Sequence, residues 1–190
     1  MDLANARSYR IRRKFWKVLG AAFHVYGPND ELLGYSKQKA FVLKEDIRVY
    51  ADESLAAEVL TIRARQIIDF SAAYDVLDAR AGTKIGAAWR KGFASLLRDQ
   101  WEILDAADRP VARIREDSMA MALVRRFLSN LFPQRFTVEG ADGSAIGHMR
   151  QRFNPFVYTL HVDLEPQATI DPRIVLAAGI LLAAIEGRQN

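Results

Sequence analysis

An uninterrupted apolar run near the end of the chain constrains the fold more than any other feature. Twelve consecutive residues, 174–185, carry no polar side chain. Asp171 and Pro172 precede the run and a glycine follows it, and these residue types commonly begin and end helices. The sequence therefore predicts a helix over 172–186 that is apolar on every side.

A helix of this kind must be enclosed by protein or by lipid. At about 1.5 Å per residue the run spans roughly 18 Å, whereas a bilayer core of about 30 Å needs roughly 20 residues. Protein is therefore the better candidate to surround the helix, and we expect the rest of the chain to be built around it. The large side chains expected in this central core are Ile174, Leu176, Ile180, Leu181 and Ile185.

A second pattern recurs through the rest of the chain: a strand with alternating apolar residues, a turn rich in Asp, Asn or Gly, and a second strand. In each copy an aromatic residue or isoleucine stands two positions before Val or Ile, so both side chains point to one side of a strand. The predicted hairpins lie at 23–35, 47–60, 74–86, 101–113 and 136–147. The set is completed by a first strand within 7–17, a final strand within 153–163, and linking strands at 38–44, 61–70, 87–97 and 148–154.

Open sheet edges invite aggregation, so a meander of this many strands must close or split into two sheets. Closure around the apolar helix covers the edges and encloses the helix at the same time. We therefore predict a mainly β fold, a single domain over 1–190 in which a closed antiparallel β-barrel, with strands over 9–163, surrounds the C-terminal helix. One further amphipathic helix is predicted at 118–132, ended by Pro133.

The amino-acid composition excludes some classes of function. The 190 residues include no cysteine, which excludes disulfides, thiolate catalysis and zinc–sulfur sites and fits a reducing cytoplasm. The net charge of +4 mildly favours anionic partners. No segment reads as a signal peptide or as a conventional transmembrane span, so we expect a cytoplasmic protein.

No group of residues has the spacing of a catalytic or metal site. His24, His148 and His161 are far apart and belong to no metal-ligand motif, so a structural or surface role is the stronger interpretation. The glycines at the ends of 82–86 are too close together for a phosphate-binding loop and suit a hairpin turn. We expect no enzyme activity, no metal and no cofactor.

Two basic clusters are candidates for binding anionic lipid. Basic side chains near an anionic membrane contribute about 1 kcal/mol each, and aromatic rings favour the membrane interface. The candidate lipid-binding residues, from 7–17 and from the helix at 118–132, are Arg7, Arg10, Arg12, Arg13, Lys14, Trp16, Lys17, Arg125 and Arg126. The alternatives are an edge strand kept soluble by its charge and ordinary packing of the helix on the barrel. Nucleic acid ranks below a membrane, because no nucleic-acid module is recognisable.

Three segments resemble a known family: the hairpins Tyr74–Gly86 and Trp101–Ile114 and the terminal segment Asp171–Ile185. In pattern and order they are similar to the LURP-one-related proteins and the phospholipid scramblases, both of the tubby C-terminal-like superfamily, over nearly the whole chain from Phe15 to Ile185. The resemblance implies a closed barrel of about twelve antiparallel strands around a central C-terminal helix. It does not extend to calcium-driven scrambling, because residues 164–171 lack the acidic spacing of a calcium site.

We therefore expect a non-enzymatic protein of the LURP-one-related or scramblase-like type that binds anionic phospholipid peripherally at a membrane surface. The alternative is a soluble structural barrel, or one that binds a protein partner, with no membrane role.

Overall fold

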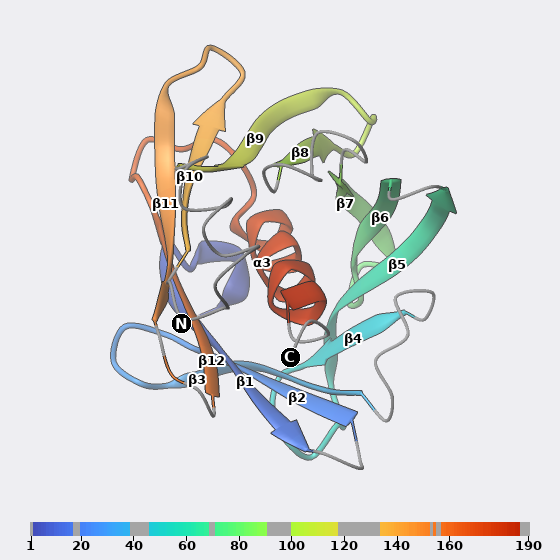
Figure 1. Cartoon of the computed structure of the whole chain (residues 1–190). Helices are drawn as coiled ribbons and strands as arrows, with labels where there is room; N and C mark the ends of the chain where they lie inside the picture. The colour runs from blue at the N-terminus through green and yellow to red at the C-terminus, as the bar shows by residue number, and fades with distance from the viewer. Residues whose placement is uncertain are drawn as a thin grey trace.

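Antiparallel strands close into a barrel around the C-terminal helix in the computed structural model of the chain (Figure 1). The structure describes residues 2–16, 20–38, 46–68, 71–90, 100–117, 134–152, 154 and 157–186. A short 3-10 helix, η1 (Leu3–Asn5), precedes the first strand. The twelve strands of the barrel are β1 (Ser8–Trp16), β2 (Gly20–Tyr26), β3 (Leu32–Gln38), β4 (Ile47–Tyr50), β5 (Glu58–Ile68), β6 (Ser71–Asp78), β7 (Thr83–Arg90), β8 (Gln100–Asp105), β9 (Pro110–Glu116), β10 (Arg135–Gly140), β11 (Ala145–Arg152) and β12 (Val157–Leu164).

Strands that are adjacent in the sequence are adjacent in the barrel, and β1 pairs with β12 to close it. The closing register aligns Ser8 with Asp163 and Lys14 with Val157. The mainly β, closed-barrel fold predicted from the sequence is thus confirmed.

The five predicted hairpins are confirmed as β2–β3, β4–β5, β6–β7, β8–β9 and β10–β11. Four of their turns place in the left-handed backbone conformation a residue type that tolerates it, whereas the β4–β5 turn places Leu55 there, at φ 60°. Gly82 and Gly143 have φ values of 66° and 82°, and Asp30 and Asp108 have values of 61° and 62°. The turn chemistry predicted from the sequence therefore matches the observed backbone in four of the five hairpins.

The described parts of three predicted linking strands are continuations of hairpin strands and not separate elements. Residues 61–68 continue β5, 87–90 form the end of β7, and 148–152 form the end of β11. Long strands are needed because the central helix of fifteen residues is about 22 Å long, and a strand rising about 3.3 Å per residue covers it with roughly seven residues. The remaining parts of these segments, and the predicted helix at 118–132, lie outside the described residues.

The helix α3 occupies Pro172–Glu186 and runs through the inside of the barrel (Figure 1). The Asp171 carboxylate accepts a hydrogen bond from the backbone N–H of Arg173 at 2.9 Å, which is the predicted N-terminal cap. The apolar run is enclosed by protein, and four of the five expected core side chains are at most 2% exposed: Ile174, Leu176, Ile180 and Leu181. The side chain of Ile185 lies outside the described residues.

The strands turn alternate side chains inward onto α3, and Phe23, Tyr74, Trp101 and Phe136 are among the largest that become fully buried. Gly86 on β7 marks a very close approach of helix and strand. A Cβ atom there would lie 2.4 Å from Cδ1 of Ile174 and 2.5 Å from the carbonyl oxygen of Leu104. The first turn of the helix is therefore pressed against the backbone of the barrel wall.

Candidate functional site

Strand β1 carries basic residues on both of its sides, because alternate residues of a barrel strand face the interior. The inward residues, all buried, are Tyr9, Ile11 and Arg13. The outward residues are Arg10, Arg12 and Lys14. The first predicted basic cluster is therefore divided between the interior and the surface.

Arg13 is the basic residue on the inner side, and its side chain is only 4% exposed. Its Nη1 donates hydrogen bonds to the carbonyl oxygens of Ala183 at 2.6 Å and Ala184 at 3.3 Å, near the end of α3. Carbonyls at a helix C-terminus lack partners within the helix, and a positive charge there also complements the helix dipole. The sequence groups Arg13 with the lipid-binding residues, but the structure corrects this: Arg13 fastens the central helix to β1.

Arg7 holds a different segment. Its Nη1 donates to the carbonyl oxygen of Ala168 at 2.8 Å, and its own carbonyl accepts from the N–H of Leu164 at 2.7 Å. Arg7 thus ties the start of β1 to the end of β12 and to the segment before α3. Trp16 is the last residue of β1. Four predicted groups lie outside the described residues: the Trp16 side chain, Lys17, Arg125 and Arg126.

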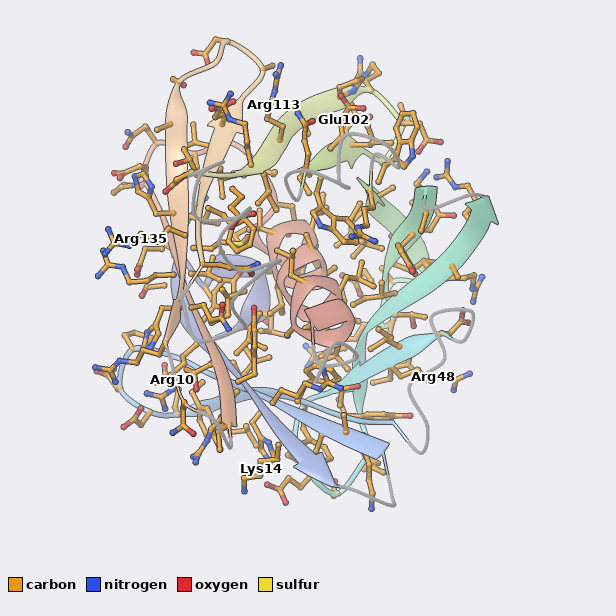
Figure 2. The ribbon with its side chains drawn as sticks, viewed as in Figure 1. Arg10, Lys14, Arg48, Glu102, Arg113 and Arg135 are labelled. Atoms are coloured by element: carbon orange, nitrogen blue, oxygen red, sulfur yellow. The ribbon has the colours of Figure 1, made fainter. Side chains whose placement is uncertain are left out.

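Barrel closure places further basic residues beside the outward side of β1. Arg10 is opposite His161 on β12, His161 is opposite Arg150 on β11, and Arg150 is opposite Arg135 on β10. A second row lies two residues further along the strands, where Thr159 on β12 is opposite both Arg12 on β1 and Arg152 on β11. We call this surface the basic face, and its cations are Arg10, Arg12, Lys14, Arg135, Arg150 and Arg152. Figure 2 shows Arg10 and Arg135 directed away from the barrel on this side.

Sequence reasoning finds the β1 part of the basic face but misses Arg135, Arg150 and Arg152. A signal for the last two was present, since exposed Arg150 and Arg152 flank Gln151 and follow the buried Met149 in the alternation of β11. No local signal joins them to β1. They become neighbours only when the first and last strands pair.

The basic face has few counter-ions. Arg10 pairs with the exposed Asp30, with Nη2 and Oδ1 2.9 Å apart. The other five cations have no ion-pair partner among the described residues. Like charges on neighbouring strands repel one another, so this arrangement does not stabilise the folded chain.

Two basic residues on the other side of the barrel are paired with nearby carboxylates. Arg48 lies 3.6 Å from Glu58, and Arg63 lies 3.3 Å from Asp46. Figure 2 shows Arg48 on the side of the barrel away from Arg10. Lys37 and Arg80 also lack an ion-pair partner among the described residues, but the basic face is where such cations lie on neighbouring strands.

His161 on β12 lies among the cations of the basic face. Burial and the guanidinium groups of Arg152 and Arg10 lower the pKa of His161 below its ordinary value, and Asp163 opposes this shift. Neighbouring positive charges disfavour the protonated imidazole. The neighbouring arginines therefore add to the effect of burial, which is the larger cause of the shift.

A hollow of about 450 Å³ lies on the basic face. Arg12, Thr159 and Arg152 are aligned across it, because Thr159 on β12 is the register partner of both arginines. Guanidinium groups and a hydroxyl are suitable donors for the oxygens of a phosphate group. The complete lining is Arg10, Arg12, Arg152, Asn154, Val157 and Thr159.

Aromatic side chains border the basic face on β2. The Arg10 guanidinium lies 5.1 Å from the centre of the Tyr26 ring, and the ring of His24 stacks on Tyr26 at 5.9 Å. His24 Nε2 lies 2.9 Å from Glu53 Oε1. An amphipathic ring beside a row of cations is a combination that suits the polar boundary of a membrane.

In the part of the chain that the structure describes, no three acidic, histidine or cysteine side chains are arranged to hold a metal ion. Within the same residues, no helix combines the length and the hydropathy needed to cross a membrane.

A closed antiparallel barrel filled by its C-terminal helix is the tubby-like architecture that the sequence resembles. The model of the LURP-one-related family matches residues 32–183, from β3 into α3. The chain therefore belongs to the LURP-one-related family. No curated protein matches the chain.

Proposed function

We propose that the protein binds anionic phospholipid peripherally at a membrane surface through its basic face, and that it acts by binding and not by catalysis. One observation carries the proposal. The row Arg10, His161, Arg150 and Arg135 crosses four strands and has a single carboxylate partner, Asp30, among the described residues.

The charge on this face is large enough to matter at a membrane. Each basic side chain near an anionic surface contributes about 1 kcal/mol, and the contribution fades within a Debye length of about 10 Å at moderate salt. Six cations share the basic face, and none of them requires unfolding or rearrangement to reach the lipid. Binding is therefore expected to be moderate, reversible and sensitive to salt.

The hollow on the basic face supports the choice of a phosphate-containing ligand. Arg12 and Arg152 flank Thr159, so a headgroup phosphate seated there meets two guanidinium groups and a hydroxyl. The scramblase-like resemblance of the sequence points to the same class of ligand. Family membership by itself names no ligand.

Vesicle co-sedimentation tests the proposal. Vesicles of phosphatidylcholine with phosphatidylserine should pellet the protein at low salt, and vesicles of phosphatidylcholine alone should not. The double variant Arg12→Glu/Arg152→Glu reverses two charges at the hollow. We expect its affinity for the anionic vesicles to fall at least about tenfold, since a loss of about 1.4 kcal/mol corresponds to tenfold.

A matched control separates the basic face from overall charge. The variant Arg48→Glu/Arg63→Glu makes the same change in net charge on the paired side of the barrel, and it should keep most of the vesicle binding. Equal losses in the two variants, or no pelleting of the unaltered protein by anionic vesicles at low salt, would contradict the proposal. The second result would favour a barrel without a membrane role.

A further inference from the structure

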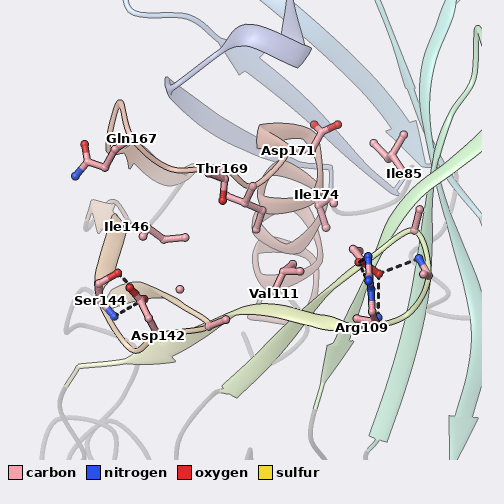
Figure 3. Close-up of a pocket in the computed structure, with 16 residues that line it drawn as sticks. Ile85, Arg109, Val111, Asp142, Ser144, Ile146, Gln167, Thr169, Asp171 and Ile174 are labelled. Carbon is pink, nitrogen blue, oxygen red and sulfur yellow. Dashed lines mark hydrogen bonds and ion pairs between the residues drawn. The ribbon is translucent and has the colours of Figure 1, made fainter.

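The open end of the barrel near the start of α3 contains a hollow of about 840 Å³, which we call the mouth hollow. Its sides are the β8–β9 turn at 106–109, the β10–β11 turn at 141–144 and the segment 167–171 that leads into α3 (Figure 3). This volume falls within the range of about 300–1,000 Å³ that is usual for small-molecule sites.

The inner wall of the mouth hollow is aliphatic. Ile170 and Ile174 are buried beneath it, whereas Ile85, Val111 and Ile146 are only half-buried. Figure 3 shows Ile146 and Ile85 on opposite sides, with Val111 and Ile174 between them. A hydrocarbon chain lying here would remove from water apolar surface that the fold leaves partly exposed.

The rim of the mouth hollow is acidic, although the whole chain has a net charge of +4. The lining includes three carboxylates but one guanidinium, that of Arg109. Asp105 is paired with Arg109 at 2.7 Å, and Asp171 with Arg173 at 2.8 Å. Asp142 differs, because it has no cationic partner among the described residues.

Asp142 is held as a carboxylate in a fixed orientation. Its Oδ1 accepts hydrogen bonds from the N–H and the hydroxyl of Ser144, at 3.0 and 2.7 Å. These bonds lower the pKa of Asp142, the hydroxyl having the larger effect. The charge at this edge of the hollow is therefore present at neutral pH and available to a ligand.

From this combination we infer that the mouth hollow binds an aliphatic amine, with its chain against the isoleucine and valine wall and its ammonium group beside Asp142. The charge of Asp142 disfavours fatty acids, which would bring a second carboxylate beside it. This ligand is opposite in charge to the one proposed for the basic face, and the two sites share no lining residue.

Titration with n-octylamine tests the inference, followed through the isoleucine methyl signals in ¹H–¹³C spectra of the full chain. The methyl signals of Ile85, Ile146 and Ile174 should shift and saturate, whereas that of Ile62, buried in β5, should not move. We expect n-octanoate, which has the same chain length and the opposite charge, to bind at least about tenfold more weakly. Propylamine, which has the charge without the long chain, should also bind weakly.

Two variants and one matched control complete the test. Asp142→Asn keeps an acceptor for the turn but removes the charge, and should weaken octylamine binding about threefold, as expected for a solvent-exposed ion pair. Thr169→Arg adds a cation at the exposed rim and should weaken octylamine binding further without weakening octanoate binding. Asp52→Asn is the control, because Asp52 makes the same two hydrogen bonds to Ser54 in another turn.

Saturable shifts with this selectivity, and an octylamine affinity that is reduced in Asp142→Asn and kept in Asp52→Asn, would support the inference. Equal affinity for octylamine and octanoate would overturn it, as would equal effects of the two asparagine variants or the absence of saturable shifts. Because Asp142→Asn leaves the basic face intact, its binding to anionic vesicles should be unchanged. The two proposals can therefore fail separately.

Discussion

At the scale of single residues, Arg12 and Arg13 have the same chemistry and opposite environments. Arg12 lines the hollow on the basic face, whereas Arg13 donates to two carbonyls of the enclosed helix. The difference follows from the two-residue period of a strand. Arg12 therefore contributes to the charge of the surface, whereas its neighbour Arg13 holds the central helix to β1.

Replacing each arginine by methionine should separate these roles. Arg13→Met removes charge-assisted hydrogen bonds at a buried helix end, and we expect the free energy of unfolding to fall by about 2–4 kcal/mol. Arg12→Met changes an outward side chain and should alter it by about 0.5 kcal/mol or less. Urea denaturation followed by circular dichroism measures both. Similar losses in the two variants would contradict the assignment of Arg13 as a fastening residue.

At the scale of elements, the central helix is held at both ends by side chains from the barrel. At its start Arg173 pairs with its neighbour Asp171 and, across the barrel wall, with Asp78 of β6 at 2.5 Å. At its end the contact comes from Arg13. Apolar packing along the helix is not directional, so these polar contacts fix how far α3 extends into the barrel.

The contact between Asp78 and Arg173 predicts a dependence of stability on pH. The backbone N–H of Ala81 and the Arg173 side chain lower the pKa of Asp78. A carboxyl group whose pKa is lowered by folding stabilises the protein above its unfolded pKa of about 4, and this contribution is lost as the pH falls through the folded value.

Asp78→Asn keeps an acceptor for the turn amides but removes the charge. We expect the variant to be about 1 kcal/mol less stable at pH 7, since the pair is only partly buried. The difference should shrink in thermal or urea unfolding as the pH is lowered below about 4. A difference that stays constant down to pH 2 would show that Asp78 acts through its turn and not through the pair with Arg173.

At the scale of the whole molecule, the centre of the hydrophobic core is α3, which comes after all the barrel strands in the sequence. Every described side chain from Ile174 to Ala184 is buried by the wall, and the wall in turn buries its inner side chains against α3. Neither the strands nor the helix has a hydrophobic core of its own. The two should therefore lose their structure together.

Deleting residues 166–190 should abolish cooperative unfolding, because the barrel would lose its central core. Calorimetry should detect no sharp transition in the shortened chain. The milder change Leu181→Ala should leave a cooperative transition and lower the free energy of unfolding by about 2–5 kcal/mol. A shortened chain that still melts in one sharp transition would show that the strands form a core without α3.

The parts of this fold that depend on local chemistry can be predicted from the sequence. Turn residues such as Asp108 and Gly143 mark the hairpins, and the run at 174–185 has too few residues to cross a bilayer and no polar side at all. The basic face cannot be predicted in this way, because Arg10 and Arg150 are remote in sequence and meet only through β12. The inward position of Arg13 could be predicted, because Arg13 follows Tyr9 and Ile11 at two-residue intervals and so points to the same side of the strand. Its charge favoured a position on the surface instead.

The pairing of β1 with β12 also sets the order in which the molecule can be made. Ser8 on β1 pairs with Asp163 on β12, so the barrel cannot close during synthesis until β12 has left the ribosome. The helix that fills the barrel follows later still. Until then the nascent sheet has two unpaired edges and an uncovered apolar side, which is the condition in which strands associate with other chains. This topology therefore prolongs the time during which the nascent chain can associate with others.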